Sequence, residues 1–371
     1  MEKVVFTAQA AQNVLPVSEQ TLSLALRFIV ILTAATVSLF LWMLIFHIIS
    51  VNRFKKMERF KSAVEKSAVK AAADTTLKAA DILPPVNILL GKSNISALNE
   101  LFSTLPPEHK NALIALINQL DCSTFITNGL NEEDNEEYLI DLMRVVGELN
   151  LVSHADKITS IIKDNKDNID IIFEALLALA RMNSSEQFMQ ICMDKKYIKR
   201  ISFRNLQEII IAYTGDREIL YKKLLTAPDN YIIRICIKRI GAEGIESLSP
   251  NIVKFLDSKN FNLVIDALRT IGALKYKPAA EKVQKLLKHD NWEIRNAVVQ
   301  ATAAIDIDQY TDSLIEALQD SEWFVRYNAG KALCEATELK EVRDKVYATN
   351  DEFAIEMLNY MMAMSGIRRV F

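Results

Sequence analysis

The side chains that could do chemistry are scattered along this chain of 371 residues. The four histidines are His47, His109, His154 and His289. They lie too far apart in the sequence to nominate a site. Paired carboxylates occur at Glu132–Glu133 and Glu136–Glu137, within the run NEEDNEEY. A solvated loop between helices explains that run better than a general acid/base pair.

Cysteines and sequence motifs give no catalytic centre either. The four cysteines are Cys122, Cys192, Cys236 and Cys334. Each lies in an apolar helical pattern, and none has a metal-binding or redox spacing, so a reducing compartment suits them. The chain has no Gly-rich phosphate loop, no HExxH, no GxSxG and no dinucleotide fingerprint. We therefore predict no catalytic residue, no metal and no cofactor, and we expect that the protein is not an enzyme.

Composition indicates a folded, all-α protein. Half of the residues are apolar and a quarter are charged, while the whole chain has only 9 Gly and 8 Pro. A fold of short strands and tight turns would need more of both. The net charge of −3 gives no sign of a nucleic-acid partner.

A long apolar stretch near the N-terminus is predicted to cross a membrane. Residues 28–49 read FIVILTAATVSLFLWMLIFHII, 22 residues without Asp, Glu, Lys or Arg. As a helix they would be ~33 Å long, against a hydrocarbon core of ~30 Å. A cleaved signal peptide has a shorter apolar region, and a buried core helix is seldom apolar on every face. We therefore expect a retained anchor at residues 28–50.

Basic residues beside this stretch predict its orientation. Lys3 and Arg27 precede it. Five basic residues follow it within 12 positions: Arg53, Lys55, Lys56, Arg59 and Lys61. Because Lys and Arg stay on the cytosolic side, we expect a single-pass membrane protein with its N-terminus outside and its C-terminal part cytosolic. In a bacterium this would be the plasma, or inner, membrane.

Prolines and charge divide the chain. Its predicted parts are a short non-cytosolic segment at 1–27, a transmembrane helix at 28–50, a basic juxtamembrane helix or linker at 51–84, and a repeat domain at 85–371. Pro84 and Pro85 mark the last boundary. Residues 51–80 hold eight basic and three acidic side chains, and Phe54, Met57, Val64, Ala68 and Ala71 share one helical face. A solvated stalk would explain this charge, and so would contact of residues 51–61 with anionic lipid.

A repeat of about 31 residues fills the C-terminal part. WEIR at Trp292–Arg295 and WFVR at Trp323–Arg326 are 31 residues apart. The same position recurs at Tyr138, Ile169, Ile201, Tyr231, Phe261 and Phe353. Second helices with their own start signals lie between these positions. One helical hairpin cannot bury its apolar stripe alone, so seven or eight copies should stack into a right-handed α-solenoid with one continuous core.

The repeat resembles a known family. Over residues 257–335, an Asp shortly before an Ile/Val-Arg pair, followed by alanines, is similar to the short HEAT repeats of phycobilisome lyases, an armadillo-type fold. In that family the Asp and Arg of successive repeats form a hydrogen-bonded ladder. The resemblance implies a structural ladder of Asp290, Arg295, Asp320 and Arg326. We assign Trp292 and Trp323 to packing between repeats. Upstream the match weakens, with Val264 in place of the arginine, and the register before about residue 135 stays open.

Charge is distributed unevenly along the predicted array. Residues 121–170 hold 12 acidic and 4 basic side chains, and residues 192–240 hold 11 basic and 5 acidic ones. In HEAT-like arrays the second helix of each repeat lines the concave face, which implies a partner-binding basic strip there. Its residues would be Lys195, Lys196, Lys222, Lys223, Lys254, Lys282 and Lys285. Such a strip could bind an acidic protein or anionic lipid. Lysines that only keep helix faces soluble would give the same pattern.

The anchor, the repeats and the missing catalytic motifs together predict a membrane-anchored, non-catalytic scaffold for a protein partner. It could be an accessory subunit of a membrane complex for polysaccharide synthesis, secretion or signalling. One alternative is an enzyme built on HEAT repeats, such as a bilin lyase. A change in bilin attachment on addition of the purified protein would reveal such an activity. Another is a nucleic-acid binder that uses the basic strip, which retention of DNA at low ionic strength would reveal. A membrane anchor suits both alternatives poorly.

Overall fold

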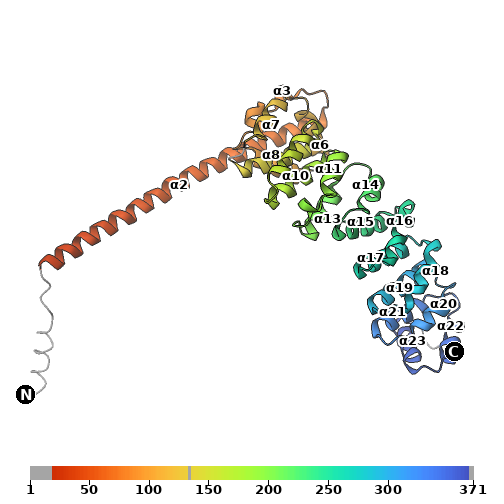
Figure 1. The fold of residues 1–371 in the computed structure, drawn as a ribbon. Coiled ribbons are helices and arrows are strands. Elements are labelled where there is room, and N and C mark those ends of the chain that lie inside the picture. Colours follow the sequence, from red (N-terminus) through yellow and green to blue (C-terminus); the bar gives the residue numbers. More distant parts are fainter. Residues whose placement is uncertain (1–18, 133–134, 367–371) are drawn as a thin grey trace, which may run out of the picture.

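The computed structural model describes residues 19–132 and 135–366, and these residues form helices and no strands. Stacked helical hairpins build a curved array, from which one long helix projects (Figure 1). The predicted all-α solenoid is therefore confirmed. Residues 1–18 of the predicted N-terminal segment lie outside the described residues. Glu133 of the acidic run NEEDNEEY lies outside them as well.

The array has two rows of helices. The inner row consists of α5 (Ile95–Thr104), α8 (Glu136–Glu148), α10 (Ile169–Arg181), α13 (Phe203–Ala212), α15 (Asn230–Glu243), α17 (Phe261–Ala273), α19 (Trp292–Asp306), α21 (Trp323–Leu333) and α23 (Glu352–Met364). The outer row consists of α7 (Ser123–Gly129), α9 (Ala155–Asp164), α11 (Ser185–Cys192), α12 (Lys195–Ile198), α14 (Arg217–Leu224), α16 (Ser249–Val253), α18 (Ala280–Lys285), α20 (Thr311–Ala317) and α22 (Leu339–Ala348). Short 3₁₀ turns complete it: η1 (Val152–His154), η2 (Glu246–Leu248), η3 (Lys254–Asp257), η4 (Lys277–Ala279) and η5 (Leu286–Lys288). At the N-terminal end lie α2 (Glu19–Ala73), α3 (Ala79–Ile82), α4 (Val86–Leu89) and α6 (Pro107–Ile117).

The long helix α2 contains the predicted anchor. It has 55 residues, which corresponds to about 82 Å. Its part from Leu26 to Ala73 includes an 18-residue window with a mean hydropathy of 2.5, none of which is buried. Among the described residues, this is the one helix that is long and apolar enough to cross a membrane, judged by length and composition alone.

The C-terminal part of α2 belongs to the array. Phe60, Val64, Ala68 and Ala71 lie on one face of the helix and are buried, where they pack with α5 and α6. The Ser67 hydroxyl donates to the carbonyl of Ile82 at 2.6 Å. The structure thus differs from the predicted division at residue 84: the core begins inside α2, because α5 and α6 need a partner for their apolar faces.

The inner helices from α8 to α23 begin within two residues of the positions that the repeat predicted. Local chemistry sets both ends. The side chains of Asn168, Asp229 and Asn291 accept hydrogen bonds from the backbone N–H groups of the following first turns, as N-caps do. After α15, Gly244 has a φ of 70°, the left-handed conformation that ends a helix.

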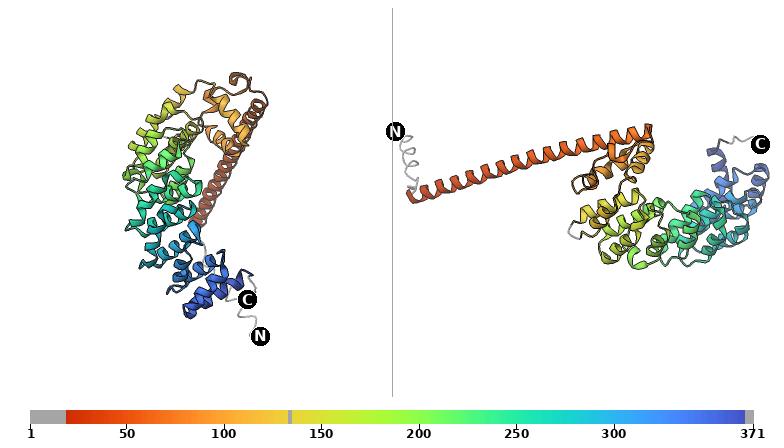
Figure 2. Two further views of the ribbon diagram at one scale, coloured as in Figure 1. Left: turned by 90° about the vertical axis from the view of Figure 1, so that its right-hand side faces the viewer. Right: turned by 90° about the horizontal axis from the view of Figure 1, so that it is seen from above.

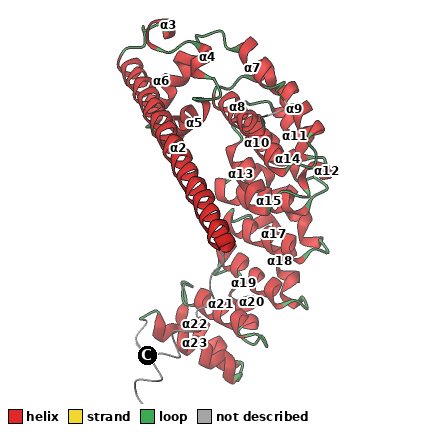
Figure 3. Ribbon diagram, turned by 90° about the vertical axis from the view of Figure 1, so that its left-hand side faces the viewer, coloured by secondary structure: helices red, strands yellow, loops and turns green. Residues whose placement is uncertain are grey.

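Small residues let the inner helices approach one another closely. A Cβ on Gly147 of α8 would lie 2.8 Å from the Cα of Ala178 in α10, and one on Gly272 of α17 would lie 2.9 Å from the Cα of Ala301 in α19. Two helices that pack this tightly on one side of a hairpin stack bend the stack toward that side. The inner row accordingly lies inside the curve, with the outer row around it (Figures 2 and 3).

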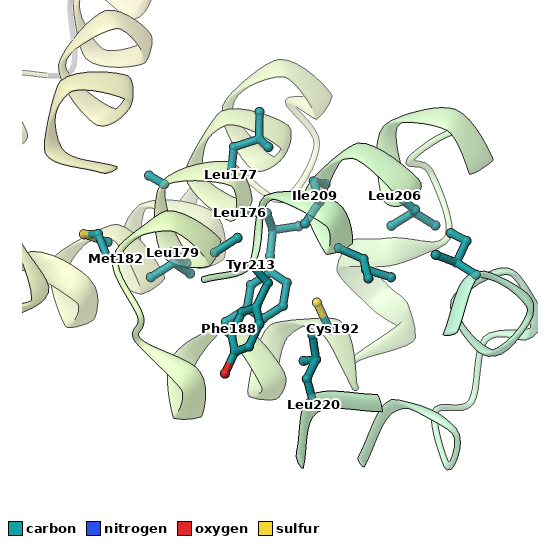
Figure 4. Packing of buried hydrophobic residues seen from close by; sticks show 14 of the residues in the cluster. Leu176, Leu177, Leu179, Met182, Phe188, Cys192, Leu206, Ile209, Tyr213 and Leu220 are labelled. Carbon is teal, nitrogen blue, oxygen red and sulfur yellow. The ribbon is translucent and has the colours of Figure 1, made fainter. Parts of the chain in front are cut away.

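The buried side chains form two clusters, which adjoin in α19 and both pack against Leu287. One cluster of buried side chains runs from Phe60 to Ile305, and a second runs from Val299 to Met362. In the first, Phe188 and Tyr213 stack with their ring centroids 5.2 Å apart, beside Cys192 (Figure 4). Burial raises the pKa of the Cys192 thiol to about 12, so this cysteine is a packing residue and not a nucleophile.

Candidate protein-binding groove

The seven predicted partner-binding lysines lie on the outer row. Lys195 and Lys196 are on α12, Lys222 and Lys223 on α14, Lys254 begins η3, and Lys282 and Lys285 are on α18. Figure 3 shows α12, α14 and α18 on the convex side, with α8, α10, α13, α15 and α17 between them and α2. The predicted concave position of these lysines is therefore wrong. The helices that begin at the Trp-x-x-Arg positions form the concave row. They carry the small residues that let neighbouring helices approach closely.

Three of these lysines are engaged by their own surroundings. Lys282 pairs with Asp257, and Lys285 pairs with Glu281 at 2.8 Å. The ammonium group of Lys196 lies over its neighbour Tyr197, 5.2 Å from the ring centroid. Such surface contacts contribute little energy. The structure thus spreads the lysines over successive outer elements and does not gather them around one cleft.

The predicted ladder forms one full rung. The Arg295 guanidinium donates to both carboxylate oxygens of Asp320, at 2.7 and 2.8 Å, and to the carbonyls of His289 and Asp290. Asp290 contributes only this carbonyl, because Val264 stands where the preceding repeat would supply its arginine. Arg326 donates to the carbonyl of Asp320 and lies 5.3 Å from the ring centroid of Phe353.

The two tryptophans that were predicted to pack between repeats differ in the rings that they contact. Trp292 stacks on Phe324 of the next inner helix, with ring centroids 5.7 Å apart, so it packs between repeats. The ring contacts of Trp323 lie within its own helix, with Phe324 at 5.1 Å and Tyr327 at 4.8 Å. Its side chain is 46% exposed.

A groove of about 610 Å³ lies on the concave face near the N-terminal end of the array. Helices α5, α6, α8, α10 and α13 supply its walls. Its charged lining residues are Glu100, Lys110, Asp141, Arg144, Glu148, Glu174, Arg181 and Glu208. The groove is therefore polar and carries both signs of charge, with carboxylates in excess.

One ion-pair network connects groove residues of α5, α8 and α10. Arg144 of α8 pairs with Glu174 of α10 and lies 3.3 Å from a carboxylate oxygen of Asp141. Asn99 of α5 donates to the same carboxylate at 3.0 Å. Burial raises the pKa of Asp141, against the hydrogen bond from Asn99 and the charge of Arg144, which lower it. The network thus links three consecutive inner helices.

A second network connects groove residues of α6, α8 and α10. Glu148 of α8 accepts from Lys110 of α6 at 2.7 Å and from Arg181 of α10 at 3.2 Å. The charged groups of the groove are therefore already positioned by neighbours. A groove with fixed charges can bind a charged protein surface with little loss of side-chain entropy. Within the residues that the structure describes, no group of three or more His, Cys, Asp or Glu side chains is placed to hold a metal ion.

Cross-repeat polar contacts continue along the concave face. Arg234 of α15 donates to Asp266 of α17 at 2.7 Å, and Asn328 of α21 donates to Asn296 of α19 at 2.8 Å. Sequence reasoning missed these residues, although Arg144–Glu174 and Arg234–Asp266 are opposite charges 30 and 32 residues apart. Complementary charges at the repeat spacing are the signal that could have identified them.

No protein-family model matches the sequence, and no curated protein matches it. Among solved structures, an importin β crystallised in an ammonium sulfate condition is similar, with a TM-score of 0.42 and 15% identity over 72% of this chain and 45% of that one. The structure of Kap95p bound to RanGDP gives 0.43 and 14% over 76% and 46%. The complex of CpcE and CpcF, the phycocyanin lyase of Nostoc sp. PCC7120, gives 0.26 and 15% over 65% and 93%. The chain thus spans about half the length of the two importin-type chains, and similarity at this level carries no argument about function.

Proposed function

We propose that this protein is a membrane-anchored, non-catalytic scaffold that holds a protein partner on the concave face of its solenoid, at the cytosolic surface of a membrane. The observation that carries the proposal is the continuity of α2. Its exposed apolar part and the part that packs into the array core are segments of one uninterrupted helix from Glu19 to Ala73.

Exposure supports the anchor at residues 28–50. The large apolar side chains from Phe28 to Ile49 are exposed on every side of α2, including Trp42 and Phe46. In water this surface would be strongly unfavourable, whereas a bilayer would cover it. The basic residues from Arg53 to Lys61 then favour a cytosolic array. They are also the residues that would contact anionic lipid.

The array is attached to the anchor without a hinge. The apolar stretch ends at Ile49, and Met57 is the first residue of α2 that packs against the array core. The eight helical steps from Ile49 to Met57 correspond to about 12 Å. Figure 3 shows the inner row on the side of the array that faces α2. A partner on the concave face would therefore lie next to the membrane, as the cytosolic part of a neighbouring membrane protein does.

This arrangement suits an accessory subunit of a membrane complex, such as one for polysaccharide synthesis, secretion or signalling. The groove supplies fixed charges for recognition, and the rigid attachment to α2 restricts the partner to a thin layer above the bilayer. Restriction of this kind raises the effective concentration of the partner without any catalysis.

Photo-crosslinking in native membranes tests the proposal. A photo-reactive amino acid replaces Phe173 in the groove or, as the matched control, Lys222 on the outer row of the full chain. We expect a single protein adduct from position 173 and none from position 222. The double reversal Arg144→Glu and Arg181→Glu should abolish the adduct, whereas Lys222→Glu and Lys223→Glu should leave it. Extraction of the chain by alkaline carbonate, or an adduct from position 222 alone, would contradict the proposal.

A further inference from the structure

A second surface, distinct from the groove, lies near the C-terminal end of the array. It is formed by the first residues of α19 and α21 and the residues just before them. We define the aromatic edge as Trp292, Trp323 and Phe324 together with the carboxylates Glu293 and Glu322. Trp323 and Phe324 are 46% and 54% exposed. Trp292 stacks on Phe324, and Trp323 contacts Phe324 edge to face. Two exposed rings and the half-buried ring of Trp292 thus form one continuous aromatic surface across two repeats.

The charge around these rings is negative. The first turns of α19, α21 and α23, with the residues just before them, carry seven carboxylates at 289–296, 320–327 and 351–356. Their two guanidinium groups are those of Arg295 and Arg326, which the chain itself engages. Glu293, Glu322 and Glu352 are exposed, and none of them is in an ion pair within the described part of the chain. Carboxylates in a first turn favour the helix, but that role does not require exposed rings.

The same position in an upstream repeat already binds cations. Phe203 is the first residue of α13, as Trp292 and Trp323 are of α19 and α21. Arg234 and Lys238 of the next inner helix both lie 5.6 Å from its ring centroid. Over Trp292 and Trp323 the described residues place no cation. Tryptophan attracts a cation more strongly than phenylalanine does.

We propose that the aromatic edge binds an extended segment of a protein partner that carries Lys or Arg. A basic side chain of that segment would lie over the exposed face of Trp323, and Glu293, Glu322 and Glu352 would neutralise its charge. The carboxylates would repel anionic lipid and nucleic acid, so a protein segment is the occupant that the charge favours. This surface does not depend on the proposed role of the groove.

Tryptophan fluorescence tests this proposal on the full chain in micelles of a neutral detergent. The chain has three tryptophans, so Trp42→Phe leaves Trp292 and Trp323 as the reporters. The probes are three short peptides of repeated Gly-Ser-Arg, Gly-Ser-Gln and Gly-Ser-Glu. We expect the Arg peptide to change the emission, with an affinity at least about tenfold above that of the Gln peptide, and added salt to weaken it. Equal affinities for the Arg and Gln peptides would overturn the proposal.

Two variants locate the binding. Glu293→Gln, Glu322→Gln and Glu352→Gln together should weaken the Arg peptide about tenfold, since three charges leave the edge. The matched control, Glu218→Gln, Glu246→Gln and Glu335→Gln, removes three exposed carboxylates elsewhere and should change nothing. The same loss in both triple variants would overturn the proposal. Because all six side chains are exposed, circular dichroism should show both variants folded. The groove reversal Arg144→Glu and Arg181→Glu should retain the peptide, which separates a failure here from a failure of the proposed function.

Discussion

The two ends of the array connect successive repeats by different ion pairs. At the N-terminal end, Arg144–Glu174 joins the middles of two inner helices across the concave face, and Arg144 is 42% exposed there. At the C-terminal end, Arg295–Asp320 joins the first turn of one inner helix to the turn before the next, and both side chains are nearly buried, at 14% and 11%. The Arg144 guanidinium remains within reach of a partner, although Glu174 is buried at 9%, whereas both groups of the second pair are enclosed by their own chain.

This difference separates stability from binding. A nearly buried, bidentate pair is strongly destabilising to break, because each partner would be left without its counter-charge. In the N-terminal pair the Arg144 guanidinium stays partly hydrated, so breaking it should cost less, although the buried Glu174 carboxylate would also lose its counter-charge. We therefore expect the C-terminal pair to hold the array together and the N-terminal pairs to shape the groove. Four experiments test whether the two ends differ in this way.

Arg295→Ala should cause the largest loss, about 3–5 kcal/mol of local stability. It leaves the Asp320 carboxylate and the carbonyls of His289 and Asp290 without their donor. Because the pair joins α19 to the turn before α21, hydrogen exchange of the full chain in micelles should show loss of protection in α21 and α23 but not in α8 or α10. Arg269→Ala, at an exposed position of α17, is the control and should stay within about 0.5 kcal/mol. Uniform loss of protection along the array would contradict the difference between the two ends.

Tight packing of the inner row, by contrast, should be equally important at both ends. Gly147→Ala and Gly272→Ala each place a Cβ less than 3 Å from the backbone of the next inner helix. Each should cost roughly 1–3 kcal/mol, because the backbones must move apart. Gly330→Ala meets side chains alone, those of Met357, Met361 and Leu318, and should cost less. Thermal melts followed by circular dichroism would measure all three, and a large effect at Gly330 alone would disprove an equally tight inner row.

The pH dependence of stability should have opposite signs at the two ends. Burial raises the pKa of Asp320, but hydrogen bonds from Arg295 and the Glu322 backbone outweigh it and lower the pKa overall. Its stabilisation is therefore present above the unfolded pKa of about 3.9 and is lost as pH falls through the folded pKa. Burial raises the pKa of Asp141, so its favourable contribution is present below about pH 3.9 and is lost as pH rises through the folded pKa.

Regional hydrogen exchange over a pH series, corrected for intrinsic rates, would measure these two effects. Asp320→Asn should flatten the acid-side loss around α19 and α21. Asp141→Asn should flatten the opposite trend around α5, α8 and α10. The same sign at both ends would show that the two carboxylates are equivalent.

Much of the fold could be predicted from the sequence, since it rests on local signals. The N-cap side chains of Asn168 and Asp229 and the spacing of Trp292 and Trp323 place the inner helices directly. The extent of α2 in the array could not be predicted. The face with Val64, Ala68 and Ala71 was visible, but nothing local indicated whether α5 and α6, a lipid or solvent would cover it.

The binding surface was the least predictable part. An apolar stripe shows which side of a helix is buried, but not which helix of a hairpin lies inside the curve. The direction of curvature follows from tight contacts between helices, such as Gly147 with Ala178, whose partners are far apart in sequence. For this reason the lysines of α12, α14 and α18 were predicted on the concave face and lie on the convex one.

Arg144→Ala should have a smaller effect on folding than Arg295→Ala and a large one on binding. Arg144 is 42% exposed, but the Glu174 and Asp141 carboxylates are buried, at 9% and 8%, so the loss should exceed that of a surface pair and stay below that of Arg295→Ala. Protonation of Asp141 would be easier in this variant, which offsets part of even that loss. A partner bound in the groove would face the Asp141 and Glu174 carboxylates without their cation. The crosslink from position 173 should therefore weaken at least about tenfold. Arg144→Lys keeps the charge but not the fork of donors, and should restore part of the crosslink. A stability loss as large as that of Arg295→Ala, with an unchanged crosslink, would make the N-terminal network structural and end the distinction between the two ends.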